Sequence, residues 1–251
     1  MQLWKYLTWE VFLRWKMQLN EINLMPLRKR IHMTVSDQFP VHSPKKASHI
    51  RRAIAAEEAR IMSTQSLFNY RAAKQKAAER LGIDMHTRLP SNVEVESELR
   101  AYQGFYGGRQ HIDHLEKMRR IALRVMRSLE AFCPRLVGPV LEGTANEFAR
   151  VSLHVFNDPP DAVVMYMLDK GFVFRNEQRK IRWYNGSHRQ VQLLVTDAEE
   201  FEVELTLFNC KDLRQAPPSP IDGRPQRRAP MSEVESLLTG SQETSDLLTN
   251  A

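Results

Sequence analysis

The spacing of apolar residues divides the chain into a helical first half and a strand-rich second half. Between Pro44 and Gly82 apolar residues recur every three or four positions, which predicts one long helix or two. Pro44 suits the first turn of such a helix, and Gly82 suits the position just past its end. The same period predicts a shorter helix after Asn92 that ends at 107–108, and then an amphipathic helix that reaches Phe132.

Past Pro134 the apolar pattern changes to the alternation expected of strands. The segments 136–141 and 151–156 are predicted strands around a tight loop, and a helix follows that ends at Gly171. Three more strands are predicted, at 172–183, 190–196 and 201–208. Asn185-Gly186 joins the first two of these, because this dipeptide is a strong hairpin signal. Helices followed by strands in this order predict an α+β fold with a mixed β-sheet backed by helices.

Composition and pattern together define four segments: a mobile amino-terminal extension (1–43), a helical region (44–133), an α/β core (134–210) and a tail (211–251). Within the tail, residues 214–231 hold five prolines and form either an ordered strap or a mobile segment. A capping box at 232–235 then predicts a short final helix. Residues 1–32 carry three Trp among Lys and Arg, which fits a helix on a membrane surface or an extension ahead of an internal start at Met33.

The composition is that of a globular protein. With 251 residues, of which 42% are hydrophobic, the chain is long enough for one domain plus an extension. Two cysteines are too few for a disulfide framework, and no apolar run of about 18 residues is present to span a bilayer. We therefore expect a soluble, cytoplasmic protein without a transmembrane segment. His111 and His114 are expected at the surface, because they lack the further ligands of a metal site.

The positive charge is concentrated in the first half of the chain. Residues 1–134 hold 23 Lys and Arg against 13 Asp and Glu, a formal charge of +10, whereas residues 135–251 hold 13 against 17, a charge of −4. Clustered cations attract phosphates, so the basic half is a candidate surface for nucleic acid or an acidic partner. Two electrostatically complementary halves of one protein would show the same asymmetry.

The segment from Arg135 to Phe156 contains a recognisable arrangement. Arg-Leu-Val-Gly leads toward a Gly143-Thr144 turn, and an apolar strand with a Leu-His dipeptide follows. This arrangement resembles the nucleotidyltransferase superfamily, with its polymerase-beta-like fold, and in particular a poorly described bacterial branch of it. The resemblance implies a nucleoside triphosphate ligand and Mg²⁺ held by an Asp-x-Asp pair plus a third carboxylate on a later strand. It also implies that Gly143, Thr144 and Asn146 bind phosphate.

The acidic pair of that family is missing from this chain. Arg150 and Ser152 stand where the two aspartates are expected, and a guanidinium repels a divalent cation. Glu204, or Glu202 on the same face of its predicted strand, is the remaining carboxylate, which makes Mg²⁺ a doubtful cofactor. Arg150 is expected either to pair with Glu204, in a site that still binds phosphate, or to face water. His154 is a candidate base or phosphate donor, or else a structural histidine.

Three functions are compatible with these features. The first is a nucleotidyltransferase-like protein with weak or absent transfer activity, which binds a nucleotide or phosphorylated ligand through Gly143, Thr144, Asn146, Arg150 and Ser152. The second is an active nucleotidyltransferase with an unorthodox site, whose candidate residues are Glu204, His154, Glu202 and Glu147. The third is an adaptor that engages nucleic acid or an acidic partner through the basic residues of 45–130.

Overall fold

The computed structural model describes residues 44–65, 69–83 and 89–249. The extension expected at residues 1–43, with both interpretations of residues 1–32, lies outside this part of the chain. Within the described ranges, no helix is both long enough and apolar enough to cross a membrane.

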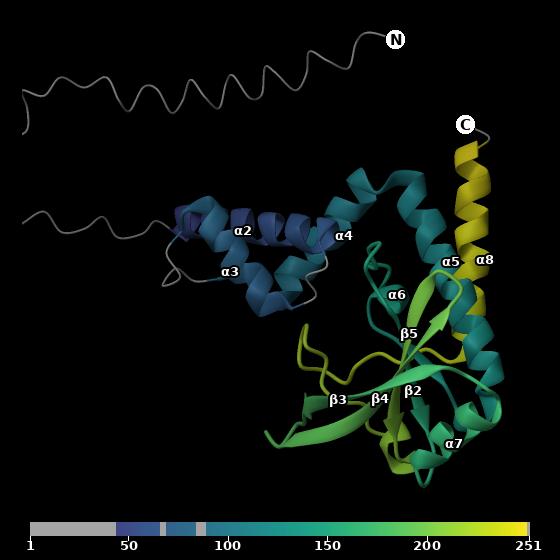
Figure 1. The fold of residues 1–251 in the computed structure, drawn as a ribbon. Coiled ribbons are helices and arrows are strands. Elements are labelled where there is room, and N and C mark those ends of the chain that lie inside the picture. Colours follow the sequence, from purple (N-terminus) through teal and green to yellow (C-terminus); the bar gives the residue numbers. More distant parts are fainter. Residues whose placement is uncertain (1–43, 66–68, 84–88, 250–251) are drawn as a thin grey trace, which may run out of the picture. The chain divides into compact units, whose positions relative to one another are not determined.

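The described helical region contains α2 (Pro44–Thr64), α3 (Tyr70–Leu81), α4 (Asn92–Tyr106) and α5 (Gly108–Ser128) (Figure 1). The sequence between Pro44 and Gly82 therefore forms two helices rather than one. The Asn69 side chain accepts hydrogen bonds from the first amides of α3, and Gly82 follows that helix with a left-handed φ of 62°. A capping box of Ser91 and Glu94 begins α4.

The second half forms a mixed five-stranded sheet in the order β1-β2-β5-β4-β3. Its strands are β1 (Arg135–Val137), β2 (Val151–Phe156), β3 (Phe174–Arg182), β4 (His188–Ala198) and β5 (Phe201–Phe208). β2 and β5 are parallel, and the other neighbours are antiparallel. The α+β fold with a mixed sheet is thus confirmed. The hairpin is confirmed as well, since Gly186 takes a φ of 79° in the turn between β3 and β4.

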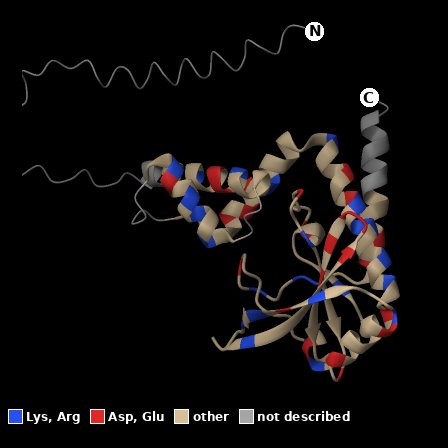
Figure 2. Ribbon diagram, in the orientation of Figure 1, with Lys and Arg blue, Asp and Glu red and all other residues tan. Residues whose placement is uncertain are grey.

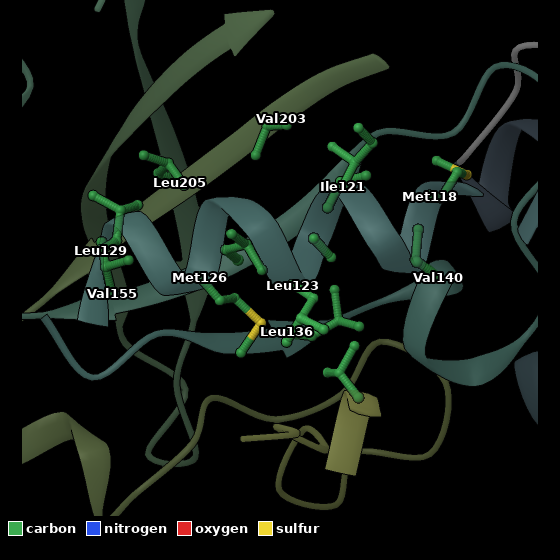
Figure 3. Close-up of a cluster of buried hydrophobic side chains, with 14 of the residues drawn as sticks. Met118, Ile121, Leu123, Met126, Leu129, Leu136, Val140, Val155, Val203 and Leu205 are labelled. Atoms are coloured by element: carbon green, nitrogen blue, oxygen red, sulfur yellow. The ribbon is translucent and has the colours of Figure 1, made fainter. Parts of the chain in front are cut away.

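Alternate residues of the central strands point to opposite faces of the sheet. On one face Val155, Val203 and Leu205 pack against α5 in the main hydrophobic core (Figure 3). α8 (Met231–Thr249) lies beside α5 and contacts β1, so two helices cover this face (Figure 1). α7 (Asp161–Asp169), the helix predicted between the second and third strands, adds Val163 and Met167 to the same core. The opposite face of the sheet carries polar side chains and is not covered by these helices.

Two elements differ from their prediction. The strand expected over 136–141 is only β1, which ends at Val137, because Gly138 takes a φ of 73° and Pro139 begins the short helix α6 (Pro139–Glu142). The final helix is also not short, since α8 begins at Met231 and is 19 residues long. Apolar residues alone could not separate a strand from a short helix at 136–141.

The proline-rich segment is an ordered strap (residues 214–230). Its middle folds back on itself, with a bridge between Pro218 and Pro225 and a left-handed Gly223 (φ 74°) in the turn. The amides of Leu136 and Ala229 donate hydrogen bonds to each other's carbonyls, so the end of the strap runs beside β1. Of the two interpretations of this sequence, the structure supports the ordered one.

Ion pairs among the described residues join the basic half of the chain to the acidic half. Figure 2 shows Lys and Arg interspersed with Asp and Glu along the helices. Pairs between the basic half and the acidic half are Arg100–Glu142, Lys117–Glu200, Arg124–Glu199 and Arg127–Glu235. Others lie within the helical region, as between Arg51 and Glu94 or between Arg60 and Glu57. These contacts favour complementary halves over a continuous open basic face.

Glu58 of α2 is a buried carboxyl group that makes no hydrogen bond within the described part of the chain. It is 0% exposed, on a helix that packs against α3 and α4, and neither carboxyl oxygen has a partner there. Burial raises the pKa of Glu58 from its ordinary 4.5 to about 8, and the Lys74 ammonium opposes only part of this shift. The folded protein therefore keeps this proton at pH values where the unfolded chain has lost it.

We expect this carboxyl group to make the protein less stable as the pH rises from 4.5 to about 8. The folded state binds one proton more than the unfolded state in this window, so each pH unit lowers the free energy of unfolding by up to about 1.4 kcal/mol. Glu58→Gln should remove this contribution, measured by urea denaturation at a series of pH values. The neighbouring Glu57→Gln should keep it. Equal slopes for Glu58→Gln and the unsubstituted protein would contradict the prediction.

Candidate functional site

A cleft of about 1340 Å³ lies on the face of the sheet that α5 and α8 do not cover. Its floor is formed by β2 and β5. Met62, Tyr70 and Leu99 line it from the helical region, and the segment 137–146, the β3–β4 hairpin and the strap supply the remaining walls. Residues far apart in the sequence therefore meet around one space.

The floor of the cleft follows from the parallel register of β2 and β5. Ser152 lies opposite Glu204, and His154 lies opposite Thr206. Paired residues on neighbouring strands point to the same face, so all four side chains are on the cleft side. Arg150 comes directly before β2 and also lines the cleft. The structure therefore brings Arg150, Ser152, His154 and Glu204 to one cleft, and of the two alternatives for Arg150 it shows the one in which the side chain faces the carboxylates.

Glu204 is a buried carboxylate neutralised by two arginines. It is 3% exposed. Nη1 and Nη2 of Arg179, on β3, donate one hydrogen bond to each of its oxygens, both at 2.7 Å. Nη1 of Arg150 lies 3.8 Å from Oε2. A bidentate guanidinium–carboxylate pair is a strong arrangement, and it satisfies both oxygens of a group that could not otherwise be buried.

Glu202 is the main partner of Arg150. Nε of Arg150 donates to Oε2 of Glu202 at 2.6 Å, and Arg175 of β3 donates to the other oxygen. The hydrogen bonds from Arg175 and Arg150 lower the pKa of Glu202. Arg150 therefore turns toward the cleft carboxylates instead of water, although its hydrogen bond goes to Glu202 and only a longer contact reaches Glu204.

Arginines occupy the carboxylate oxygens on the floor of the cleft. Both oxygens of Glu202 and both oxygens of Glu204 accept hydrogen bonds from guanidinium groups. The guanidinium charges beside these oxygens repel a divalent cation, which disfavours its coordination here. Among the described residues, no group of three or more His, Cys, Asp or Glu is placed to hold a metal ion.

In the predicted phosphate-binding turn at 143–146, the side-chain hydrogen-bond donors are bonded to other groups of the protein. Gly143 ends α6 in a left-handed conformation (φ 83°), and the amide of Thr144 donates to the Pro139 carbonyl. The Thr144 hydroxyl donates to Oε1 of Glu96 at 3.1 Å, and Nδ2 of Asn146 donates to the Met62 carbonyl at 2.6 Å. Thr144 and Asn146 line the cleft, but these donors already have partners in the protein. Phosphate binding at this turn stays a prediction.

His111 and His114 also hold the 143–146 turn. Nε2 of His111 is 3.1 Å from the carbonyl oxygen of Gly143, and Nε2 of His114 is 3.2 Å from that of Asn146. Burial lowers the pKa of His111. Sequence reasoning expected both histidines at the surface, but they are partly buried and join α5 to the turn.

Some residues of the cleft were not foreseen, and one candidate is not part of it. Arg175 and Arg179 lie on the same face of β3, a strand that the sequence predicted. Only the order of the strands in the sheet shows that they face Glu202 and Glu204. Glu147, a candidate for an unorthodox acidic site, is exposed and does not line the cleft.

Comparisons of the chain with models of protein families, with curated proteins and with solved structures find no match. The fold and the cleft are therefore the basis on which the protein is classified. The protein is an α+β protein whose five-stranded mixed sheet is covered by helices on one face and carries an arginine–carboxylate network on the other.

Arg179→Gln should destabilise the protein, because it leaves the buried carboxylate of Glu204 without its bidentate partner. We expect a loss of about 1 to 3 kcal/mol in the free energy of unfolding, less than for a fully buried pair because Arg179 is half exposed. Arg182→Gln is the matched control on the same strand. Arg182 has no hydrogen bond or ion pair among the described residues, so its loss should cost under about 0.5 kcal/mol.

Urea denaturation of both variants measures this difference. A double-mutant cycle with Glu204→Gln isolates the coupling between the two side chains. Equal stability of Arg179→Gln and Arg182→Gln would show that the ion pair does not stabilise the sheet.

Proposed function

We propose that the cleft binds a phosphorylated small molecule of the nucleotide class through arginine side chains, with weak or absent metal-assisted transfer. The observation that carries this proposal is the position of Arg150 and Arg179. Both guanidinium groups lie on the cleft floor and are fixed by hydrogen bonds to Glu202 and Glu204. Fixed guanidinium groups are well suited to phosphate, because their planar N–H donors match its oxygens.

Arg150 keeps donors for a ligand. It uses Nε for Glu202, while Nη1 lies 3.8 Å and 3.9 Å from the nearest oxygens of Glu204 and Glu177, which is too far for a hydrogen bond. Arg179 uses one N–H on each terminal nitrogen and retains the others. The carboxylates thus orient the two arginines without using all of their N–H groups.

The size and lining of the cleft suit a ligand that is larger than phosphate. Its volume of about 1340 Å³ exceeds the roughly 300 to 1000 Å³ typical of small-molecule pockets. Phe148 and Tyr184 line it and are each 44% exposed, so their rings can contact a flat group such as a base. Both features favour a nucleotide over a simple anion.

The resemblance to nucleotidyltransferases supports the same class of ligand. In this chain the position of the second missing aspartate, Ser152, lies directly beside Glu204, which stands for the third carboxylate. Arg150 occupies the position of the first missing aspartate, and it donates a hydrogen bond to Glu202, the carboxylate next to Glu204 on the same face of β5. A site that in such enzymes would hold cations is here balanced by built-in guanidinium groups, which favours binding over metal-dependent transfer.

A thermal-shift screen of the four nucleoside triphosphates, with EDTA or with Mg²⁺, tests the proposal. At least one should raise the melting temperature in EDTA, by roughly 5 to 10 °C at about 100 times its Kd, because it binds only the folded state. Arg150→Gln should remove this shift. Arg109→Gln, which breaks an exposed pair with Asp113 on α5, should not.

Two results would contradict the proposal. One is the absence of any shift with all four nucleotides. The other is Mg²⁺-dependent consumption of a nucleoside triphosphate that Glu204→Gln abolishes, which would instead identify an active transferase with an unorthodox acidic site.

A further inference from the structure

His154 and Arg228 form a buried pair at the end of the cleft floor. His154 of β2 is 4% exposed and lines the cleft. Nε of Arg228, from the strap, donates to Nδ1 of His154 at 3.0 Å. The guanidinium also donates to the Asp212 carbonyl at 2.7 Å and lies over the rings of Phe156 and Phe208. These contacts hold Arg228 in one orientation.

This contact determines where the imidazole carries its proton. A guanidinium N–H only donates, so Nδ1 of His154 must accept and the ring proton must be on Nε2. Protonation of Nδ1 would place two donors face to face. Burial, with the nearby charges of Arg228 and Arg179, lowers the pKa of His154 far below its ordinary value. The imidazole therefore stays neutral, and its one lone pair, on Nδ1, is already used by Arg228, which argues against the predicted role of His154 as a general base.

The charged groups around His154 agree with a neutral ring. Arg135 is its register partner on β1, Arg179 contributes from β3 and Arg228 from the strap. The neighbour on β5 is the uncharged Thr206. The carboxylates of Glu204 and Asp212 are bonded to Arg179 and Arg189. Among the described residues no acid forms a hydrogen bond with His154, so no carboxylate there stabilises an imidazolium.

Nε2 of His154 has no hydrogen-bond partner within the described part of the chain. The Ser152 hydroxyl, on the same face of β2, has none there either. The cleft floor therefore changes in character along β2. Arg150 lines the cleft at one end of the strand, and the neutral donors of Ser152 and His154 follow over about four residues, or roughly 13 Å. Arg135 and Arg228, which lie beside His154, are not among the residues that line the cleft.

We infer that the cleft takes a ligand with two parts: a phosphoryl group at Arg150 and Arg179, and a neutral acceptor atom of a nucleobase at Nε2 of His154. This inference rests on the proposed function and adds the chemistry of the second part. A carbonyl oxygen or an unprotonated ring nitrogen accepts from Nε2–H, and Arg228 is the positioning residue that keeps the proton there. A second phosphate is disfavoured at this end, because Arg228, whose Nη2 is buried, is not among the residues that line the cleft.

Calorimetric titration with the four nucleoside monophosphates and with ribose 5-phosphate tests the inference. At least one nucleotide should bind more tightly than ribose 5-phosphate, which lacks a base. His154→Leu should weaken that nucleotide by about threefold to tenfold, the value of one neutral hydrogen bond, and leave ribose 5-phosphate unchanged. His154→Gln should restore the affinity, because its amide nitrogen reaches the position of Nε2.

Nitrogen-15 NMR of the labelled imidazole gives a readout that does not depend on the variants folding. His154 should show the Nε2-protonated neutral tautomer from pH 5 to 8, and Nε2 should shift when the nucleotide binds but not with ribose 5-phosphate. A titration within this range, or the other tautomer, would overturn the inference.

The outcomes separate this inference from the function on which it rests. If neither ribose 5-phosphate nor any nucleotide binds, the proposed function fails. If ribose 5-phosphate binds as tightly as every nucleotide, or if His154→Leu weakens both equally, the cleft still binds phosphate and only the role of His154 is wrong.

Discussion

The carboxylate of Glu204, buried in the middle of the sheet, requires positive charge beside it. The parallel pairing of β2 and β5 places this group next to Ser152, and the order of the strands places Arg179 within reach from β3. A buried unpaired carboxylate is costly, so the stability of the sheet depends on the Arg179 guanidinium as well as on the hydrogen bonds between its strands. The same contact that stabilises the fold fixes an arginine on the floor of the cleft, and this links the stability of the protein to its proposed binding chemistry.

The turn at 143–146 has a structural role, whether or not it also binds phosphate. Thr144 bonds to Glu96 of α4, Asn146 bonds to the end of α2, and two histidines of α5 approach the carbonyls of the turn. These bonds join the helical region to the core and so form one wall of the cleft. The glycine is needed because it ends α6 with a positive φ, whatever the turn binds.

The pattern of apolar residues was sufficient for most of the fold but for only part of the site. Helical and strand periods, with the hairpin signal at Asn185-Gly186, located α2 to α5 and the last three strands, although β3 is exposed along nearly its whole length. They did not separate β1 from α6, where Gly138 and Pro139 change the backbone within an apolar run. The orientation of Arg150 was left open, whereas Ser152, His154 and Glu204 were expected at one site, and all four line one cleft. Their partners Arg179 and Arg228 were not foreseen, because pairing across strands and the path of the strap cannot be read from local spacing.

In the proposed anion site on the cleft floor, arginines take the place of metal ions. A crystal structure of the protein with ADP and Mn²⁺, with anomalous data to locate the metal, distinguishes the two. We expect phosphoryl oxygens within hydrogen-bond distance of Arg150 and Arg179, with both arginines still bonded to their carboxylates and no manganese at Glu202 or Glu204. A manganese ion coordinated by Glu204, with Arg179 displaced from it, would contradict the account.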